Sequence, residues 1–146
     1  MMFEITTPER TVFKEDVDQI TLPTLQGEIT VLPHHLPLVS VIKPGTIRIL
    51  KNGAEEWLAV AGGFIEVRPD NRVIVLADTA ERAEEIDTER AAEARARAEK
   101  LLIEKKFDDV EYSTFAAKLE RELARLRVAG RKRRGHGFAE APSEKE

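Results

Sequence analysis

Residues 46–61, TIRILKNGAEEWLAVA, decide the fold class of the first half of the chain. Polar and apolar side chains alternate from Thr46 to Ile49, so one row is expected to face a core and the other solvent. Asn52-Gly53 then stands between two β-type runs, and both residues tolerate a positive φ. The stretch therefore predicts two antiparallel strands joined by a tight turn.

Short runs of the same kind occur on both sides of this hairpin, at spacings of roughly 8–12 residues. Turn signals such as Thr7-Pro8 and Pro69-Asp70-Asn71 separate them. Gly62-Gly63 predicts a bulge or a close approach between backbones. We therefore expect an antiparallel β-sandwich over residues 1–84. Its further strands are expected at Phe3–Ile5, Val17–Leu22, Gly27–Val31, Phe64–Val67 and Arg72–Ala77.

The second half of the chain has a different composition. Of its last 66 residues 32 are charged, against 18 of the first 80, and no glycine occurs between Phe64 and Ala129. Apolar residues recur there at spacings of three and four, as on one face of a helix. The pattern predicts two helices. The first carries Ala91, Ala94, Ala98 and Leu101-Leu102, and the second carries Tyr112, Phe115-Ala116, Leu119, Leu123 and Leu126.

These helices are expected to form an antiparallel hairpin over residues 85–130, because the connection around Lys106–Asp109 is short. Asp87 is predicted to cap the first helix and Gly130 to end the second. Alanine buries little area, so the hairpin should dock weakly on the sandwich and could be mobile. Residues 131–146 contain few large apolar side chains and are predicted to be disordered.

Composition argues against several classes of site. The 146 residues include no cysteine, which excludes disulfides and thiolate metal sites. The sequence contains no stretch of 18 or more apolar residues, the length that a membrane-spanning helix needs. None of the common phosphate-binding or nucleophile motifs occurs, so an enzyme is the weaker hypothesis. Adjacent histidines point to opposite faces of a strand, so His34-His35 favours a surface loop over a metal site.

Four arginines on the predicted helices are spaced to meet an anion. Arg90 and Arg97 share a face with Asp87, and Arg121 and Arg125 form an i,i+4 pair. In an antiparallel hairpin these guanidiniums would converge near the open end, where their forks suit phosphate oxygens. Ordinary surface ion pairs are the simpler interpretation, and spacing alone favours it. Candidate partners for such pairs are Glu93, Glu120 and Glu122.

A dense basic run, Arg131 to Arg134, follows the second helix. Cations at a helix C-terminus complement the helix dipole, so a solvated terminus explains the run as well as docking on an acidic protein surface does. Nucleic acid is not an expected partner, because aromatic residues are not interleaved with the cations and the net charge is −4.

Several blocks of the sequence resemble the epsilon subunit family of F-type ATP synthases. The resemblance covers about residues 2–130 and is carried most specifically by GEITVLPHHLPL at 27–38. Further matching blocks are Pro44-Gly45, AVAGGFIEV at 59–67, VLAD at 75–78 and Ala80-Glu81. The family architecture is a β-sandwich followed by a two-helix hairpin, which agrees with the patterns described above.

The resemblance implies a non-catalytic rotor subunit that couples the c-ring to the gamma subunit. It places the chain at the cytoplasmic side of the cell membrane, attached through the complex. Glu28 and His35 correspond to the ring-facing region. In the extended hairpin, Arg121, Arg125, Arg127 and the cluster from Arg131 would face the alpha and beta catalytic subunits and inhibit ATP hydrolysis.

Bacillus-type members of this family bind ATP through the motif I/L-D-x-x-R-A, and Ile86–Ala91 reads IDTERA. The resemblance implies ATP as a regulatory ligand rather than a catalytic cofactor, and it reverses the preference for simple ion pairs. Bound ATP is expected to hold the hairpin down. The implied binding residues are Glu81, Asp87, Arg90, Arg97, Arg121 and Arg125. The alternative hypothesis is a free-standing cytosolic ATP-sensing or adaptor protein.

Overall fold

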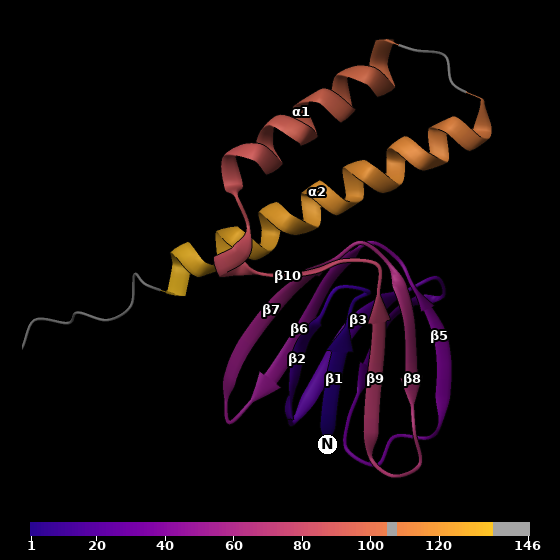
Figure 1. Cartoon of the computed structure of the whole chain (residues 1–146), viewed down its shortest axis with the longest axis vertical. Coiled ribbons are helices and arrows are strands. Elements are labelled where there is room, and N and C mark those ends of the chain that lie inside the picture. Colours follow the sequence, from indigo (N-terminus) through magenta and orange to yellow (C-terminus); the bar gives the residue numbers. More distant parts are fainter. Residues whose placement is uncertain (105–107, 136–146) are drawn as a thin grey trace, which may run out of the picture.

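The computed structural model describes residues 1–104 and 108–135 of the chain and has a β-sandwich with a helical hairpin above it (Figure 1). The N-terminal half contributes ten strands and the short 3-10 helix η1 (Ala83–Glu85). The strands are β1 (Met2–Thr6), β2 (Thr11–Asp16), β3 (Gln19–Thr24), β4 (Gly27–Val31), β5 (Leu38–Ile42), β6 (Gly45–Lys51), β7 (Ala54–Val60), β8 (Gly63–Val67), β9 (Arg72–Ala77) and β10 (Ala80–Arg82).

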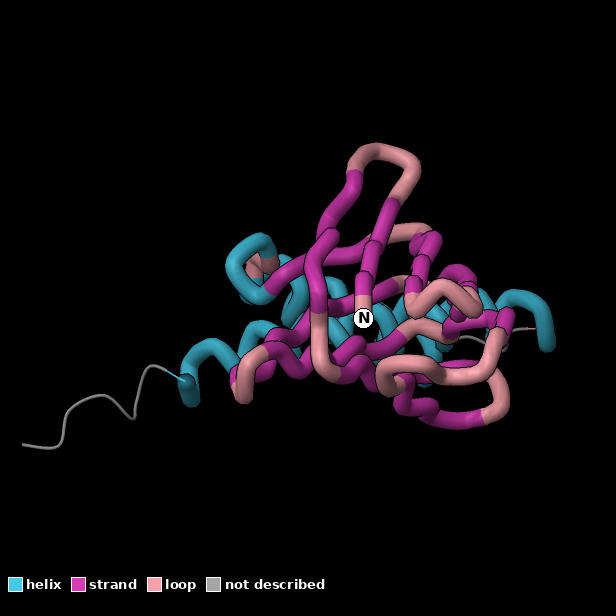
Figure 2. Tube along the Cα trace, turned by 90° about the horizontal axis from the view of Figure 1, so that it is seen from below, coloured by secondary structure: helices cyan, strands magenta, loops and turns pink. Residues whose placement is uncertain are grey.

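The strands are hydrogen-bonded in the order β10-β7-β6-β3-β5-β8-β9-β1-β2, with β4 paired to β3. All pairs are antiparallel except β1 and β9, which run parallel. This pair places the first strand of the chain beside one of the last strands of the sandwich. Seen from the end opposite the hairpin, the strands lie in front of the helices (Figure 2). The predicted β-sandwich is confirmed.

The core consists of the inward row of each strand. Ile47 and Ile49 of β6 are fully buried, as the alternation of this strand predicts. Phe3 and Phe13 contribute the largest buried side chains, with ring centroids 5.6 Å apart. Burial of these aliphatic and aromatic side chains, at about 25 cal/mol per Å² of apolar area, is the main force that holds the sandwich together.

Two glycine positions behave as predicted. Asn52 and Gly53 have φ values of 50° and 78°, and they form the turn between β6 and β7. Gly63 has a φ of 140°, and a Cβ placed there would lie 2.1 Å from the carbonyl oxygen of Leu76. The backbones of β8 and β9 approach so closely at this point that only glycine fits.

Three strands were not predicted from the sequence: β2, β5 and β10. In β2 the adjacent residues Val12 and Phe13 are both buried, so the strand does not alternate. In β5 the outward residue Val39 is apolar and exposed, which hides the period of two. The three residues of β10 form a strand because β7 offers them a free edge. Each of these strands can be recognised only from the elements that it packs against or pairs with, and not from its own sequence.

The C-terminal half forms helices α1 (Thr88–Glu104) and α2 (Asp109–Gly135). Asp87 caps α1 as predicted, since its Oδ1 accepts a hydrogen bond of 3.1 Å from the backbone N–H of Arg90. Of the predicted break at Lys106–Asp109, Lys106 and Phe107 lie outside the described residues, and Asp108 is not helical. Asp108 caps α2 in the same way, accepting a 2.8 Å hydrogen bond from the N–H of Glu111.

The prediction that Gly130 ends the second helix is wrong. The α-helix α2 continues to Gly135, so Arg131 to Gly135 are helical rather than disordered. A glycine ends a helix when it adopts a positive φ, and Gly130 is not among the residues with one. Residues 136–146 of the predicted tail lie outside the described part of the chain.

The hairpin is folded down on the sandwich, and α2 lies between α1 and the strands (Figure 1). The contact is a small apolar cluster of Ala59, Ile86, Ala124, Val128 and Ala129, with Trp57 and Ala83 packed against it. Ala91 and Ala98 are the buried residues of α1. Neither described helix is long and apolar enough to cross a membrane.

Candidate functional site at the junction of hairpin and sandwich

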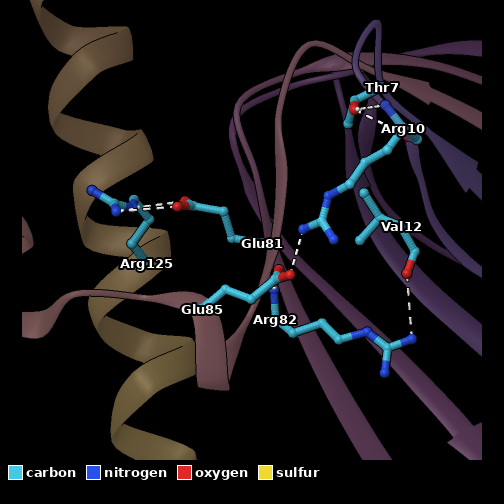
Figure 3. A network of polar contacts seen from close by, with 7 residues as sticks. All are labelled: Thr7, Arg10, Val12, Glu81, Arg82, Glu85 and Arg125. Carbon is cyan, nitrogen blue, oxygen red and sulfur yellow. Dashed lines mark hydrogen bonds and ion pairs between the residues drawn. The ribbon is translucent and has the colours of Figure 1, made fainter.

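A two-point ion pair joins the sandwich to the hairpin. Arg125 of α2 donates hydrogen bonds to both carboxylate oxygens of Glu81 in β10, at 2.7 and 3.1 Å (Figure 3). It donates a third to Glu122 at 2.9 Å. The three side chains are 13–25% exposed. Burial by itself lowers the pKa of Arg125. The hydrogen bonds to Glu122 and Glu81 outweigh this effect, so the pKa is raised overall and Arg125 stays charged.

A second network anchors the linker between the two halves. Glu85 of η1 pairs with Arg10 in the turn between β1 and β2, and it accepts a hydrogen bond of 3.0 Å from the N–H of Arg82 (Figure 3). The Arg82 guanidinium donates to the carbonyl of Val12 at 3.3 Å and lies 5.4 Å from the ring centre of Phe13. The linker therefore stays with the sandwich by contacts independent of α2.

The electrostatics of the linker follow from these contacts. The hydrogen bond from Arg10, followed by that from the backbone of Arg82, holds the pKa of Glu85 below its usual value. The same pair raises the pKa of Arg10. Both groups therefore remain ionised near neutral pH.

The remaining residues of the predicted anion site have spare hydrogen-bond donors. The side chain of Arg90 is 85% exposed, and its Nε lies 3.6 Å from Asp87. Arg97 is exposed and pairs with no other described residue. The Nε of Arg121 is buried and has no hydrogen-bond partner within the described part of the chain. Burial of Ala91 and Ala98 places their neighbours Arg90 and Arg97 at the edges of the seam between the helices.

The geometry therefore divides five of the six predicted ATP residues into two groups, and the sixth, Asp87, is the cap of α1. Glu81 and Arg125 bind each other and join the two halves of the chain. Arg90, Arg97 and Arg121 carry donors that lack strong partners within residues 1–104 and 108–135, and guanidinium groups of this kind suit phosphate oxygens. The alternative of simple ion pairs holds for Arg125, whose partners are Glu122, as predicted, and Glu81.

A groove of about 1250 Å³ opens beside the end of α2, above β6 and β7. Arg131 lies against Trp57 here, with its Cζ 3.4 Å from the ring centre, and Arg48 approaches the same ring at 5.9 Å. Arg127 and Glu28 also line the groove. The contacts of Trp57 with Arg131 and of Arg10 with Glu85 were not predicted from the sequence, because the partners are 74 and 75 positions apart and no local pattern marks such contacts.

The two residues predicted to face the c-ring lie apart. Glu28 is exposed on β4 and lines the groove, whereas His35 lies in the loop between β4 and β5, with its Nδ1 2.8 Å from the carbonyl oxygen of Leu36. The neighbouring His34 has a positive φ of 63°, and its backbone N–H donates a hydrogen bond to Oδ1 of Asn71. Within residues 1–104 and 108–135, no cluster of three metal-ligating side chains is found.

An apolar strip covers the outer face of β5, β8 and β9. Val39, Phe64 and Leu76 are 71%, 56% and 57% exposed, and with Ile74 they surround a hollow of about 250 Å³. Contiguous exposed apolar side chains of this size usually mark a protein interface. This strip was not predicted from the sequence, because the strands that carry it are brought together by pairing in the folded sheet.

Two family models match consecutive parts of the chain. Residues 1–83 match the ATP synthase delta/epsilon chain beta-sandwich domain, and residues 84–130 match the ATP synthase delta/epsilon chain long alpha-helix domain. The boundary falls in η1, where the sheet ends and the linker to the helices begins.

Curated relatives are similar over most of their length. An ATP synthase epsilon chain of Dehalococcoides mccartyi is 47% identical over 135 residues, which are 92% of this chain and 95% of the relative. The epsilon chain of Chloroflexus aggregans is 48% identical over 126 residues, 86% and 89% of the two chains. That of Halalkalibacterium halodurans is 42% identical over 127 residues, 87% and 95% of the two chains.

Solved structures share the fold. A chain of the Euglena gracilis mitochondrial ATP synthase, solved by cryo-EM with OSCP, F1 and the c-ring, superposes with a TM-score of 0.72. It is 26% identical, and the match covers 87% of this chain and 79% of that one. A chain of the Tetrahymena thermophila mitochondrial enzyme has a TM-score of 0.60 at 14% identity, covering 90% and 94%, and shows the likeness of fold alone.

Proposed function

The chain belongs to the epsilon subunit family of F-type ATP synthases, and on this basis we propose that bound ATP controls whether its hairpin stays on the sandwich. The chain is a central-stalk subunit of the rotary complex. The regulatory step is a choice between the folded-down hairpin and an extended one that inhibits ATP hydrolysis. ATP shifts this choice only if it binds one form more tightly than the other.

The observation that carries the proposal is the unequal pairing of the arginines. Arg125 is paired with two carboxylates, whereas the buried Nε of Arg121 has no partner among the described residues and Arg90 is bound only loosely by Asp87. A triphosphate would supply acceptors to these donors and would offset the repulsion among them. Arg97, exposed on α1, would contribute a further guanidinium.

ATP would favour the folded-down hairpin because its binding residues come from both helices and from the segment next to the sandwich. Asp87, Arg90 and Arg97 belong to the first helix and its cap, and Arg121 belongs to the second. Extension of the hairpin would separate them, so the extended form would bind ATP more weakly. A ligand that prefers one form stabilises it by mass action.

A calorimetric titration of the purified chain with ATP tests this step. We expect saturable one-to-one binding by the wild type and its loss in Asp87→Ala/Arg90→Ala. The matched control is Arg95→Ala/Glu99→Ala, which removes an acid–arginine pair of 2.8 Å from the same helix and should leave binding intact. Absence of wild-type binding at millimolar ATP would contradict the ATP step and leave the family assignment untouched.

The surfaces of the sandwich suggest its partners in the complex. We assign the apolar strip of Val39, Phe64 and Leu76 to the gamma subunit, because an exposed apolar face suits a permanent protein contact. Glu28 and His35 are the proposed contacts to the c-ring. Through these partners the chain would associate with the cytoplasmic side of the cell membrane, as a non-catalytic peripheral subunit.

In the extended hairpin, Arg121, Arg125, Arg127 and Arg131 are the proposed contacts to acidic segments of the alpha and beta subunits. Arg125 would first have to leave Glu81. Co-purification of the chain with gamma and the alpha–beta ring tests the assignment to the complex. A free-standing ATP sensor would bind nucleotide without retaining these partners.

A further inference from the structure

We propose that Trp57 and Arg131 form a latch that holds the C-terminal end of α2 on the sandwich. The latch rests on the mobile hairpin of the proposed function and adds a control that does not involve ATP. It opposes extension of the hairpin, and it withdraws Arg131 from the inhibitory contact for as long as α2 is docked.

The contact joins the two halves of the chain directly. Trp57 belongs to β7, and the guanidinium carbon of Arg131 lies 3.4 Å from the centre of its ring. Separation well below 6 Å places the cation in the attractive field of the indole, which is the best aromatic partner for a cation. Val128, fully buried in the junction, precedes Arg131 by three residues, so the helix directs both side chains toward β7.

The latch matters because the rest of the junction is small. Of the five buried residues in its apolar cluster, Ala59, Ala124 and Ala129 are alanines, which bury little area on docking. Trp57 packs against this cluster and is larger than any side chain in it. Loss of the cation above the Trp57 ring should therefore shift the equilibrium measurably toward the undocked hairpin.

The helix reaches Arg131 only because it does not end at Gly130. The segment matched by the family model stops at residue 130, and Arg131 is the first residue after it. The groove around the latch is also lined by Glu28, Glu55, Glu56 and Glu84, of which Glu55 pairs with Arg48 at 3.3 Å and Glu56 with Arg82 at 3.9 Å. The contact that the structure describes for Arg131 is the one with the ring of Trp57.

Hydrogen exchange of the backbone amides of residues 121–129 reports on docking, because the helical hydrogen bonds of α2 open more readily once the helix has lost its packing on the sandwich. For Arg131→Ala, without ATP, we expect a roughly five-fold faster exchange, the factor that corresponds to about 1 kcal/mol of a cation–π contact. Alanine is a better helix former than arginine, so lost helix propensity would not produce this change. Unchanged exchange in Arg131→Ala would overturn the latch.

A matched control and a double mutant isolate the contact. Lys118→Ala removes a cation that lies 5.2 Å from the ring centre of Phe115. Both residues belong to α2, so docking should not change. In a Trp57→Leu background, Arg131→Ala should cause no further acceleration, because the aromatic face is already gone. An equal acceleration with and without Trp57 would also overturn the proposal.

The same measurement with ATP separates the latch from the ATP step. Faster exchange in Arg131→Ala, combined with no effect of ATP on the wild type, would support the latch and contradict ATP control. Slower exchange with ATP in both proteins, combined with no effect of the substitution, would support ATP control and overturn the latch.

Discussion

Glu81 and Arg125 are 44 positions apart in the sequence, yet both oxygens of the Glu81 carboxylate bind the guanidinium of Arg125, at 2.7 and 3.1 Å. The pair joins the last strand of the sandwich to the second helix of the hairpin. It is partly buried, with the two side chains 15% and 25% exposed, so solvent weakens it less than it weakens surface pairs. Extension of the hairpin requires its rupture.

Glu81→Gln should loosen the docked hairpin. The substitution keeps one oxygen acceptor and removes the charge, while Glu122 still neutralises Arg125. We expect a loss of about 1–2 kcal/mol in the free energy of docking, in the lower range for hydrogen bonds to charged groups. Hydrogen exchange of α2 amides measures it. Glu99→Gln, which weakens the exposed pair with Arg95, is the control and should have little effect.

Gly63→Ala should destabilise the sandwich by several kcal/mol. Its Cβ would lie 2.1 Å from the carbonyl oxygen of Leu76 and 2.8 Å from the Cα of Ala77, and its φ of 140° is unfavourable for alanine. The expected loss exceeds about 3 kcal/mol in urea unfolding. Gly53→Ala provides the comparison, because it has a positive φ of 78° but open space around it, and should cost only about 1 kcal/mol.

Gly130→Ala should stabilise the protein. Gly130 is exposed and lies inside α2, and an added Cβ would have none of the described neighbours within 4 Å. Replacement of a solvent-exposed helical glycine by alanine adds about 0.5–1 kcal/mol, because the unfolded chain loses freedom. Thermal unfolding of the two proteins checks this. A lower melting temperature in the variant would mean that Gly130 needs a positive φ and ends the helix after all.

Acid should weaken the anchor of the linker. The hydrogen bond from Arg10 lowers the pKa of Glu85 in the folded protein below its ordinary value of 4.5. A carboxyl group with a depressed pKa stabilises the fold above its unfolded pKa, and this contribution is lost as the pH falls through the folded pKa. The wild type should therefore exceed Glu85→Gln in stability at neutral pH, and the difference should shrink below pH 4.5.

Urea unfolding of both proteins across this range measures the difference. Arg10→Ala is the matched control from the other side of the pair, because it should return the pKa of Glu85 toward its ordinary value while leaving the carboxyl group in place. A difference between wild type and Glu85→Gln that is independent of pH would contradict the role given to this ion pair.

The architecture could be predicted from the sequence wherever an element depends on residues that are close together along the chain. Alternation at Thr46–Ile49 and the Asn52-Gly53 turn depend only on neighbouring residues, and both are confirmed. The cap at Asp87 is equally local, since its carboxylate reaches the N–H three residues ahead. The strand β2 was missed for the complementary reason, because Val12 and Phe13 both face apolar surroundings supplied by distant strands.

What the sequence by itself determined is therefore the class of fold, the hairpin and the set of arginines. Only the tertiary structure decided that Arg125 takes Glu81 as partner, that Arg10 anchors the linker and that the helix passes Gly130 to place Arg131 on Trp57. Secondary structure follows from spacing along the chain, whereas these pairings depend on which elements the packed core brings together.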